Sequence, residues 1–278
     1  MRSISLTVVA MLMVFTGCAT GGKPGGANHG AGGDPSPRPV AIDPAKVIDL
    51  SYAFGDQTIY WPTAEPFKLR RVAYGRTPGG YFYAANNISM AEHGGTHMDA
   101  PIHFAEGKRT SGEVPLSNCI GPAAVIDVRG ACAADADYLL TVDDLLGWER
   151  SHGRLPRGAI VVMHSGWGER WPDKKRYLGT DVPLDVDNLR FPGFSPEAAT
   201  FLVTQRDVAA IAVDTASVDR GQSKDFRVHQ IMNGANKPMF ENVANVGRLP
   251  PAGATFIALP LKIENGSGGP ARIIAVGE

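Results

Sequence analysis

Three short apolar runs in the middle of the chain constrain its fold more than any other feature. They cover residues 123–128, 160–163 and 208–213. Runs of this length without polar alternation are typical of strands buried on both faces of a sheet. Helix start signals lie between them, at Thr141 with Asp144 three residues later and at Ser195 before Pro196. Strands that alternate with helices in this way predict an α/β fold.

Further strands are predicted on both sides of this region. They cover residues 47–50, 67–74, 81–90, 255–263 and 271–276, and a short helix covers 225–232. Pro78-Gly79-Gly80 provides the turn between the second and third of these strands. Because strands outnumber helices, we predict a single α/β domain with a mixed β-sheet or barrel-like core flanked by helices.

The first residues have the pattern of an export signal. Arg2 precedes an apolar stretch at residues 4–15, and Gly17-Cys18 follows it. This ending resembles a bacterial lipobox, although Leu is usual at the position of Phe15. We therefore predict a lipoprotein-type signal peptide at 1–18, a Gly- and Pro-rich tether at 19–45 and a hydrolase domain at 46–278. The alternative is a plain secretory signal that is cleaved nearby.

These segments also predict the location and partners of the protein. We expect export to the periplasmic side and a lipid anchor in the outer membrane, with no other membrane contact. The net charge of -1 and the short basic cluster Lys174-Lys175-Arg176 argue against a nucleic-acid partner. Cys119 and Cys132 remain after Cys18, in a compartment that permits a disulfide. We also expect a homo-oligomer, a dimer or higher.

A dense cluster of histidines carries the clearest chemical signal. The segment 93–103 reads HGGTHMDAPIH, with three histidines and Asp99. Imidazole and carboxylate groups are typical ligands of Zn²⁺ and Mn²⁺. In an extended stretch His97 and Asp99 project to the same side, and Pro101 is expected to keep the chain extended up to His103. Gly94 and Gly95 allow a tight backbone path and the close approach of a ligand or metal.

This segment resembles the motif H-x-G-T-H-x-D-x-P-x-H of the cyclase or kynurenine-formamidase-like metal hydrolases. Every fixed position of that motif is present. The resemblance implies that His93, His97 and Asp99 bind metal and that His103 acts as the acid/base. It also implies a fold of the swivelling β/β/α type.

The resemblance implies two later metal ligands, His229 and Glu241. Asp99 and Glu241 would then bridge two metals, with His229 on the second, although some members use a single manganese. The alternative is that His229 packs on its helix and Glu241 is a surface acid. Glu241 follows Phe240 and precedes Val243, and a carboxylate in apolar surroundings usually has a cationic partner. The expected cofactor is Mn²⁺ or Zn²⁺, as one or two ions.

Two further residues are candidates for substrate binding. The resemblance places an aromatic side chain near Trp61 against the substrate ring, and a core tryptophan is an equal alternative. Ser217 follows the run 208–213, and sites cluster at strand ends. No G-x-S-x-G elbow is present, so a serine nucleophile is not expected.

Together these residues predict hydrolysis of an amide bond by a metal-activated water, with His103 moving the proton. The segments 213–226 and 262–270 resemble the isatin-hydrolase-like branch, so the expected substrate is a cyclic or other aryl amide. One alternative is an arylformamidase that acts on N-formylkynurenine. Another is a non-catalytic, lipid-anchored metal- or solute-binding lipoprotein, which would have no need of His103 beside the metal.

Overall fold

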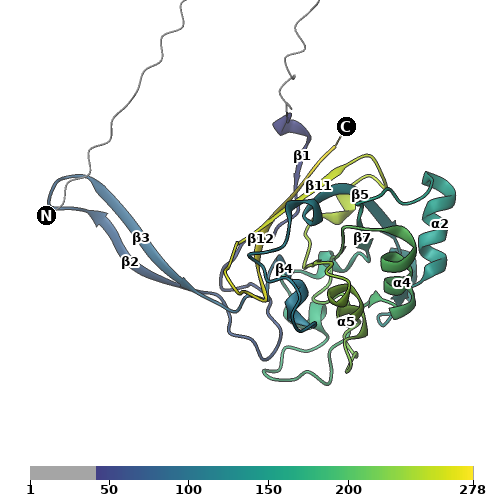
Figure 1. Cartoon of the computed structure of the whole chain (residues 1–278). Coiled ribbons are helices and arrows are strands. Elements are labelled where there is room, and N and C mark those ends of the chain that lie inside the picture. Colours follow the sequence, from purple (N-terminus) through teal and green to yellow (C-terminus); the bar gives the residue numbers. More distant parts are fainter. Residues whose placement is uncertain (1–41, 278) are drawn as a thin grey trace, which may run out of the picture. The chain divides into compact units, whose positions relative to one another are not determined.

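A closed sheet of seven strands forms the centre of the fold in the computed structural model, which describes residues 42–277 (Figure 1). The strand order is β12-β11-β5-β7-β9-β10-β4, and β4 pairs back onto β12. Their bounds are β4 (His97–Asp99), β5 (Ile120–Asp127), β7 (Ile160–His164), β9 (Ala210–Val213), β10 (Met239–Glu241), β11 (Thr255–Pro260) and β12 (Gly268–Val276). A further strand, β1 (Val47–Asp49), pairs with β12. The predicted barrel-like mixed core is confirmed.

The three apolar runs became β5, β7 and β9, which pair in parallel with one another, and β10 continues this parallel arrangement. The remaining pairs of the ring are antiparallel. Successive side chains of a strand point to opposite faces. Val161 therefore packs into the apolar layer beneath the helices, whereas its neighbours Ile160 and Val162 belong to a second apolar cluster. Burial on both faces explains why these runs are almost entirely apolar, with Asp127 at the exposed end of β5 as the exception.

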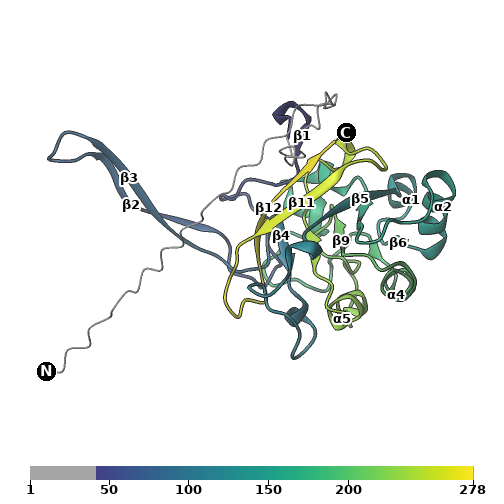
Figure 2. The same ribbon diagram turned by 45° about the horizontal axis from the view of Figure 1, so that its top comes forward.

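Helices cover one side of these parallel strands (Figure 2). This cover consists of α1 (Arg129–Ala134), α2 (Val142–His152), α4 (Pro196–Phe201) and α5 (Arg227–Gly234). The short helix α3 (Lys174–Leu178) packs in a separate apolar cluster. Thr141 caps α2 and shares a capping box with Asp144, as the sequence indicated. Ser195 caps α4 by accepting the N–H of Ala198. Past α4 the backbone continues as a π-helical turn, Leu202–Arg206.

Two pairs of strands lie outside the ring. The pair β6 (Leu139–Leu140) and β8 (Gly193–Phe194) is short and parallel. The pair β2 (Lys68–Arg76) and β3 (Phe82–Ser89) forms the predicted hairpin, with the turn at Pro78-Gly79-Gly80. Both ribbon views show this hairpin extending away from the barrel (Figures 1 and 2).

The predictions about the N-terminus, membrane spans and cysteines stand differently against the structure. The predicted signal peptide at 1–18 and most of the tether lie outside the described residues. Within residues 42–277, no helix has the length and apolar character needed to cross a membrane. In the same range Cys119 and Cys132 are buried and not bonded to each other.

Candidate metal centre and its cavity

Two neighbouring strands bring the predicted acidic ligands together. β4 and β10 pair antiparallel, and their register sets Glu241 opposite His97. Residues opposite one another share a face of the sheet, and so does Asp99, two positions after His97. Nε2 of His97 lies 3.1 Å from Oδ1 of Asp99 and 3.5 Å from Oε2 of Glu241. All three side chains are buried.

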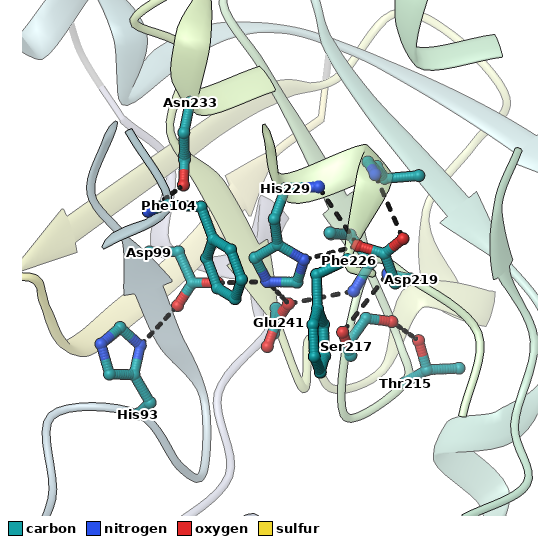
Figure 3. Close-up of polar contacts among 12 residues, drawn as sticks. His93, Asp99, Phe104, Thr215, Ser217, Asp219, Phe226, His229, Asn233 and Glu241 are labelled. Atoms are coloured by element: carbon teal, nitrogen blue, oxygen red, sulfur yellow. Dashed lines mark hydrogen bonds and ion pairs between the residues drawn. The ribbon is translucent and has the colours of Figure 1, made fainter. Parts of the chain in front are cut away.

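His229 approaches the same carboxylates from the first turn of α5 (Figure 3). Its Nε2 lies 3.2 Å from Oδ2 of Asp99 and 3.4 Å from Oε1 of Glu241. Each carboxylate therefore directs one oxygen toward His97 and the other toward His229. Oε1 of Glu241 also accepts the backbone N–H of Val218.

Contacts on the far side of each ring determine which nitrogen faces the carboxylates. Nδ1 of His97 lies 2.9 Å from the carbonyl oxygen of Gly95, to which it can only donate. Nδ1 of His229 lies 2.6 Å from Oδ2 of Asp219, and Asp219 also accepts the N–H groups of Val228 and His229. Histidines that bind metals are commonly held in this way, because the outer hydrogen bond fixes the ring and its tautomer.

His93 contacts the same group of residues from the loop before β4. Its Nδ1 lies 2.6 Å from Oδ1 of Asp99, and its Nε2 lies 2.9 Å from Oγ of Ser267. Ser267 in turn donates to the carboxylate of Glu92 at 2.6 Å. Because the Ser267 hydroxyl donates its proton to Glu92, it accepts a hydrogen bond from Nε2–H of His93. The proton of the His93 ring is therefore on Nε2, and the lone pair of Nδ1 points at Asp99. A lone pair and a carboxylate oxygen repel one another unless a cation or a proton lies between them.

His103 lies beside this cluster, although its backbone differs from the prediction. Pro101–His103 is a 3₁₀ turn and not an extended segment. Proline at the first position of a turn has a φ that suits helical backbone, which explains the difference. The His103 ring stacks on His93 with the ring centres 3.8 Å apart.

The two glycines of this segment, Gly94 and Gly95, allow close packing and an unusual backbone conformation. Gly94 lies under the ring of Tyr60, and a Cβ at that position would be 2.1 Å from a ring carbon. Gly95 has a φ of +55°, a conformation that favours glycine. The tight backbone path is confirmed, and Gly94 also lines the cavity described below, so the expected approach of a ligand stays a prediction.

Burial and mutual charge shift the pKa values of the clustered groups. Burial and the charge of Asp99 raise the pKa of Glu241. Burial would lower the pKa of His97, but Asp99 and Glu241 outweigh it and raise that pKa to about 9. Burial lowers the pKa of His103 to about 4, and the nearby imidazoles add to this effect. That value lies below the near-neutral one expected for an acid/base histidine.

These groups fit a divalent cation. Nε2 of His97 is buried without a hydrogen-bond partner, which is costly for a polar atom unless another ligand takes its lone pair. Two carboxylates packed this closely also require a compensating positive charge. The ligand atoms of His97, Asp99 and Glu241 lie within 4.8 Å of one another, and so do those of His93, Asp99 and His103. The set of nitrogen and oxygen donors suits Zn²⁺ or Mn²⁺.

A cavity of about 240 Å³ opens above this cluster. The five predicted ligands, His103, Trp61 and Ser217 all line it. Three aromatic side chains form part of its wall: the rings of Trp61 and Phe226 are 6.1 Å apart, and those of Phe104 and Phe226 are 5.3 Å apart. Ser217 also accepts the N–H of Asp219 at 3.3 Å.

Sequence reasoning missed several residues of this site. Phe104 could have been predicted, because it directly follows His103, the last residue of the motif. Phe226 and Asp219 gave none, because their positions depend on how the loop before α5 folds. Ser267 and Glu92 were missed for the same reason, since they are far apart in the sequence and meet only in the fold.

Comparison with known proteins gives matches over most of the chain. The family model described as cyclase matches residues 48–220. An isatin hydrolase of Roseibium aggregatum is 35% identical over 205 residues, which cover 71% of this chain and 76% of the relative. A kynurenine formamidase of Paracidovorax citrulli is 28% identical over 190 residues, which cover 67% of this chain and 77% of the relative.

Solved structures agree with the sequence comparison. Isatin hydrolase A from Ralstonia solanacearum superposes with a TM-score of 0.76 and 35% identity, covering 84% of this chain and 92% of the other. An isatin hydrolase bound to the product analogue thioisatinate superposes with a TM-score of 0.74 and 29% identity, covering 83% and 92%.

Proposed function

The chain belongs to the cyclase family, and from that premise we propose that it is a metal-dependent amide hydrolase that opens a cyclic aryl amide of the isatin type. The relative from Roseibium is an isatin hydrolase, and one solved relative holds the product analogue thioisatinate. The cavity of about 240 Å³ with aromatic walls suits a small aryl ligand of this class.

One observation carries the proposal. Two buried carboxylates, Asp99 and Glu241, lie between imidazoles at the bottom of an aromatic cavity. A structural ion pair needs no cavity, and an ordinary apolar pocket needs no buried charges. The combination is typical of a site that holds a cation and presents it to a small molecule.

We propose that His93, His97 and Asp99 hold a divalent cation, Mn²⁺ or Zn²⁺. The way Asp99 and Glu241 share their oxygens between His97 and His229 suits a second ion at His229. Such a cation, when bound, lowers the pKa of a water molecule from 15.7 to about 7 and polarises a carbonyl oxygen. Asp219 keeps the His229 ring oriented, and Ser267 does the same for His93.

We propose that His103 is the group that moves the proton. Its lowered pKa leaves the imidazole neutral at pH 7, so a ring nitrogen can accept the proton of the attacking water. The same proton then passes to the amide nitrogen as the carbon–nitrogen bond breaks, which leaves a carboxylate and an amine. Within residues 42–277, no hydrogen bond to another residue ties up either nitrogen of this ring.

The aromatic wall supplies binding and exclusion of water. Phe104 lies 4.4 Å from the ring of His229 and contacts Phe226, so it covers the metal residues on the side of the cavity. Trp61 meets Phe226 edge-on and leaves a flat apolar surface for an aryl ring. We propose that Trp61 binds the substrate ring and that Ser217 contacts its polar edge.

The test combines metal analysis with two substrates. Purified protein should contain Mn²⁺ or Zn²⁺ and should hydrolyse isatin. The reaction is measured as the decrease in the absorbance of isatin. His97→Ala and Asp99→Ala should lose metal and activity while circular dichroism stays unchanged. His152→Ala, on α2 and outside the cavity lining, is the control and should keep both. Full metal content in both site variants would contradict the assignment.

The choice of substrate separates the alternatives. Turnover of N-formylkynurenine in place of isatin would favour an arylformamidase, the activity named for the Paracidovorax relative. Retained metal with no turnover of any aryl amide would favour a non-catalytic metal- or solute-binding lipoprotein.

A further inference from the structure

A second cavity lies at the carboxyl ends of two parallel strands, apart from the metal centre. Its volume is about 290 Å³, and it shares no lining residue with the cavity above the metal centre. One wall is α1, which follows β5, and another is the turn Trp167–Arg170, which follows β7. Folds with parallel strands commonly bind their ligands at this end of the strands. The second cavity is therefore in a position where a ligand is expected.

Three arginine side chains, Arg129, Arg170 and Arg176, line this second cavity. Arg129 is paired with Asp127, whose carboxylate accepts two of its N–H groups at 2.9 and 2.7 Å. Glu169, the one acidic residue of the lining, interacts with the charge of Arg129 as well. Within residues 42–277, no carboxylate lies within ion-pair distance of Arg170 or Arg176. Two of the three guanidinium groups therefore lack an anionic partner in the part of the chain that the structure describes.

Packing holds the side chain of Arg170 in place before any ligand binds. Its guanidinium lies over the ring of Trp167, with the central carbon 3.2 Å from the ring centre. One of its N–H groups donates to the carbonyl oxygen of Arg176 at 3.3 Å. The stacking and this hydrogen bond fix the plane of the guanidinium, so little side-chain entropy is lost when its other N–H groups bind an anion.

The positive charges of Arg170 and Arg176 act on one another. Burial and the charge of Arg176 lower the pKa of Arg170, which shows that the two guanidinium groups repel. Arg176 is exposed, and within residues 42–277 its guanidinium makes no hydrogen bond. An anion between the two groups replaces this repulsion with two attractions. Guanidinium groups suit the oxygens of such an anion, because their N–H groups can bind two oxygens at once.

We propose that this second cavity binds a small phosphate monoester through Arg170 and Arg176. A phosphate monoester has a second pKa of about 6, so it carries a charge of about -2 at pH 8. That charge matches the two guanidinium groups that lack a partner. The organic part of the ligand lies against Cys132 and Ala133 of α1, which belong to the same lining. The basic cluster 174–176 therefore contributes Arg176 to a site for a small anion.

The test measures the binding of glycerol 3-phosphate to the full chain at pH 8 by isothermal titration. One molecule should bind per chain. Arg170→Gln and Arg176→Gln should each weaken the binding about tenfold, as expected when a charge-assisted hydrogen bond is lost. Arg150→Gln is the matched control, because Arg150 is exposed on α2 and lies outside the cavity lining, and it should leave the affinity unchanged. Circular dichroism should show that all three variants are folded.

Two further measurements check the class of ligand and the place where it binds. Dimethyl phosphate is a diester, like the phosphate of a phospholipid headgroup, and it carries a single charge, so it should bind more weakly than the monoester. Phosphate could also bind a cation at the metal centre. His97→Ala, which removes a proposed metal ligand, should therefore bind glycerol 3-phosphate as tightly as the parent protein does.

Other outcomes would overturn the proposal. Absence of binding at millimolar glycerol 3-phosphate would do so, as would an unchanged affinity in both Arg170→Gln and Arg176→Gln or an equal loss in Arg150→Gln. Loss of binding in His97→Ala would assign the phosphate to the metal centre instead. Equal affinity for dimethyl phosphate would contradict the match between the charge of the monoester and the two guanidinium groups.

Discussion

Asp219 offers a sharp test of how the metal centre is held, because it contacts no cation itself. Its carboxylate accepts Nδ1–H of His229 at 2.6 Å and the backbone N–H groups of Val228 and His229 at 3.1 Å each. One side chain therefore orients a proposed metal ligand and satisfies the first turn of α5. We predict that Asp219→Ala weakens both the metal site and the helix.

The expected magnitudes follow from these contacts. Removing the partner that orients a metal-binding histidine typically costs roughly 10–100-fold in metal affinity. Loss of a helix cap costs about 1 kcal/mol, and the unpaired, buried Nδ1–H adds about 1 kcal/mol more. We therefore expect Mn²⁺ or Zn²⁺ to bind roughly 10–100-fold more weakly and the free energy of unfolding to fall by about 2 kcal/mol.

Asp219→Asn should give an intermediate result. The amide has one oxygen that can accept from His229, but its NH₂ group cannot accept the N–H of Val228. Isothermal titration with the metal and urea unfolding measure the two effects separately. Asp225→Asn is the control, because Asp225 is exposed on the same loop and does not touch His229. Unchanged metal affinity in Asp219→Ala, or a larger defect in Asp219→Asn, would refute the reasoning.

Three further predictions use other parts of the chain. His103→Ala should keep its metal but lose about 10²–10⁴-fold in kcat, and loss of metal measured by mass spectrometry would make His103 a ligand. Cys18→Ser should move the protein from the membrane to the soluble fraction of a cell extract, and a soluble wild type would contradict the lipid anchor. Burial raises the pKa of Cys119 to about 11 and that of Cys132 to about 12, so little reactive thiolate exists at pH 8. Iodoacetamide should label these two only after unfolding, or in the folded protein only as the pH rises toward those values; rapid labelling at pH 8 would contradict this.

The sequence was most informative where structure is local. The apolar runs at β5, β7 and β9, the cap at Thr141 and the turn at Pro78-Gly79-Gly80 each depend on neighbouring residues, and all are found. Three of the five proposed ligands lie in the long histidine motif, and the resemblance that this motif carries implied the other two, His229 and Glu241. The structure places all five around one cavity.

What could not be predicted depends on distant parts of the chain. β10 has three residues, Met239–Glu241, and is a strand only because β9 and β4 lie on either side of it. Pairing of β4 with β12 closes the ring, and nothing in either segment indicates that partner. His103 was expected on an extended stretch because Pro101 suits that as well as a turn, and packing decided between them.

The position of β4 in the sequence affects the order of synthesis, folding and metal binding in the cell. It carries His97 and Asp99, and its two neighbours, β10 and β12, come from the last 40 residues of the chain. A growing or unfolded chain therefore has the histidine motif long before it has the pocket that gathers the other donors. If the chain crosses the inner membrane unfolded, as the proposed export requires, ring closure takes place on the far side. The metal supply of that compartment then determines which ion the finished protein captures.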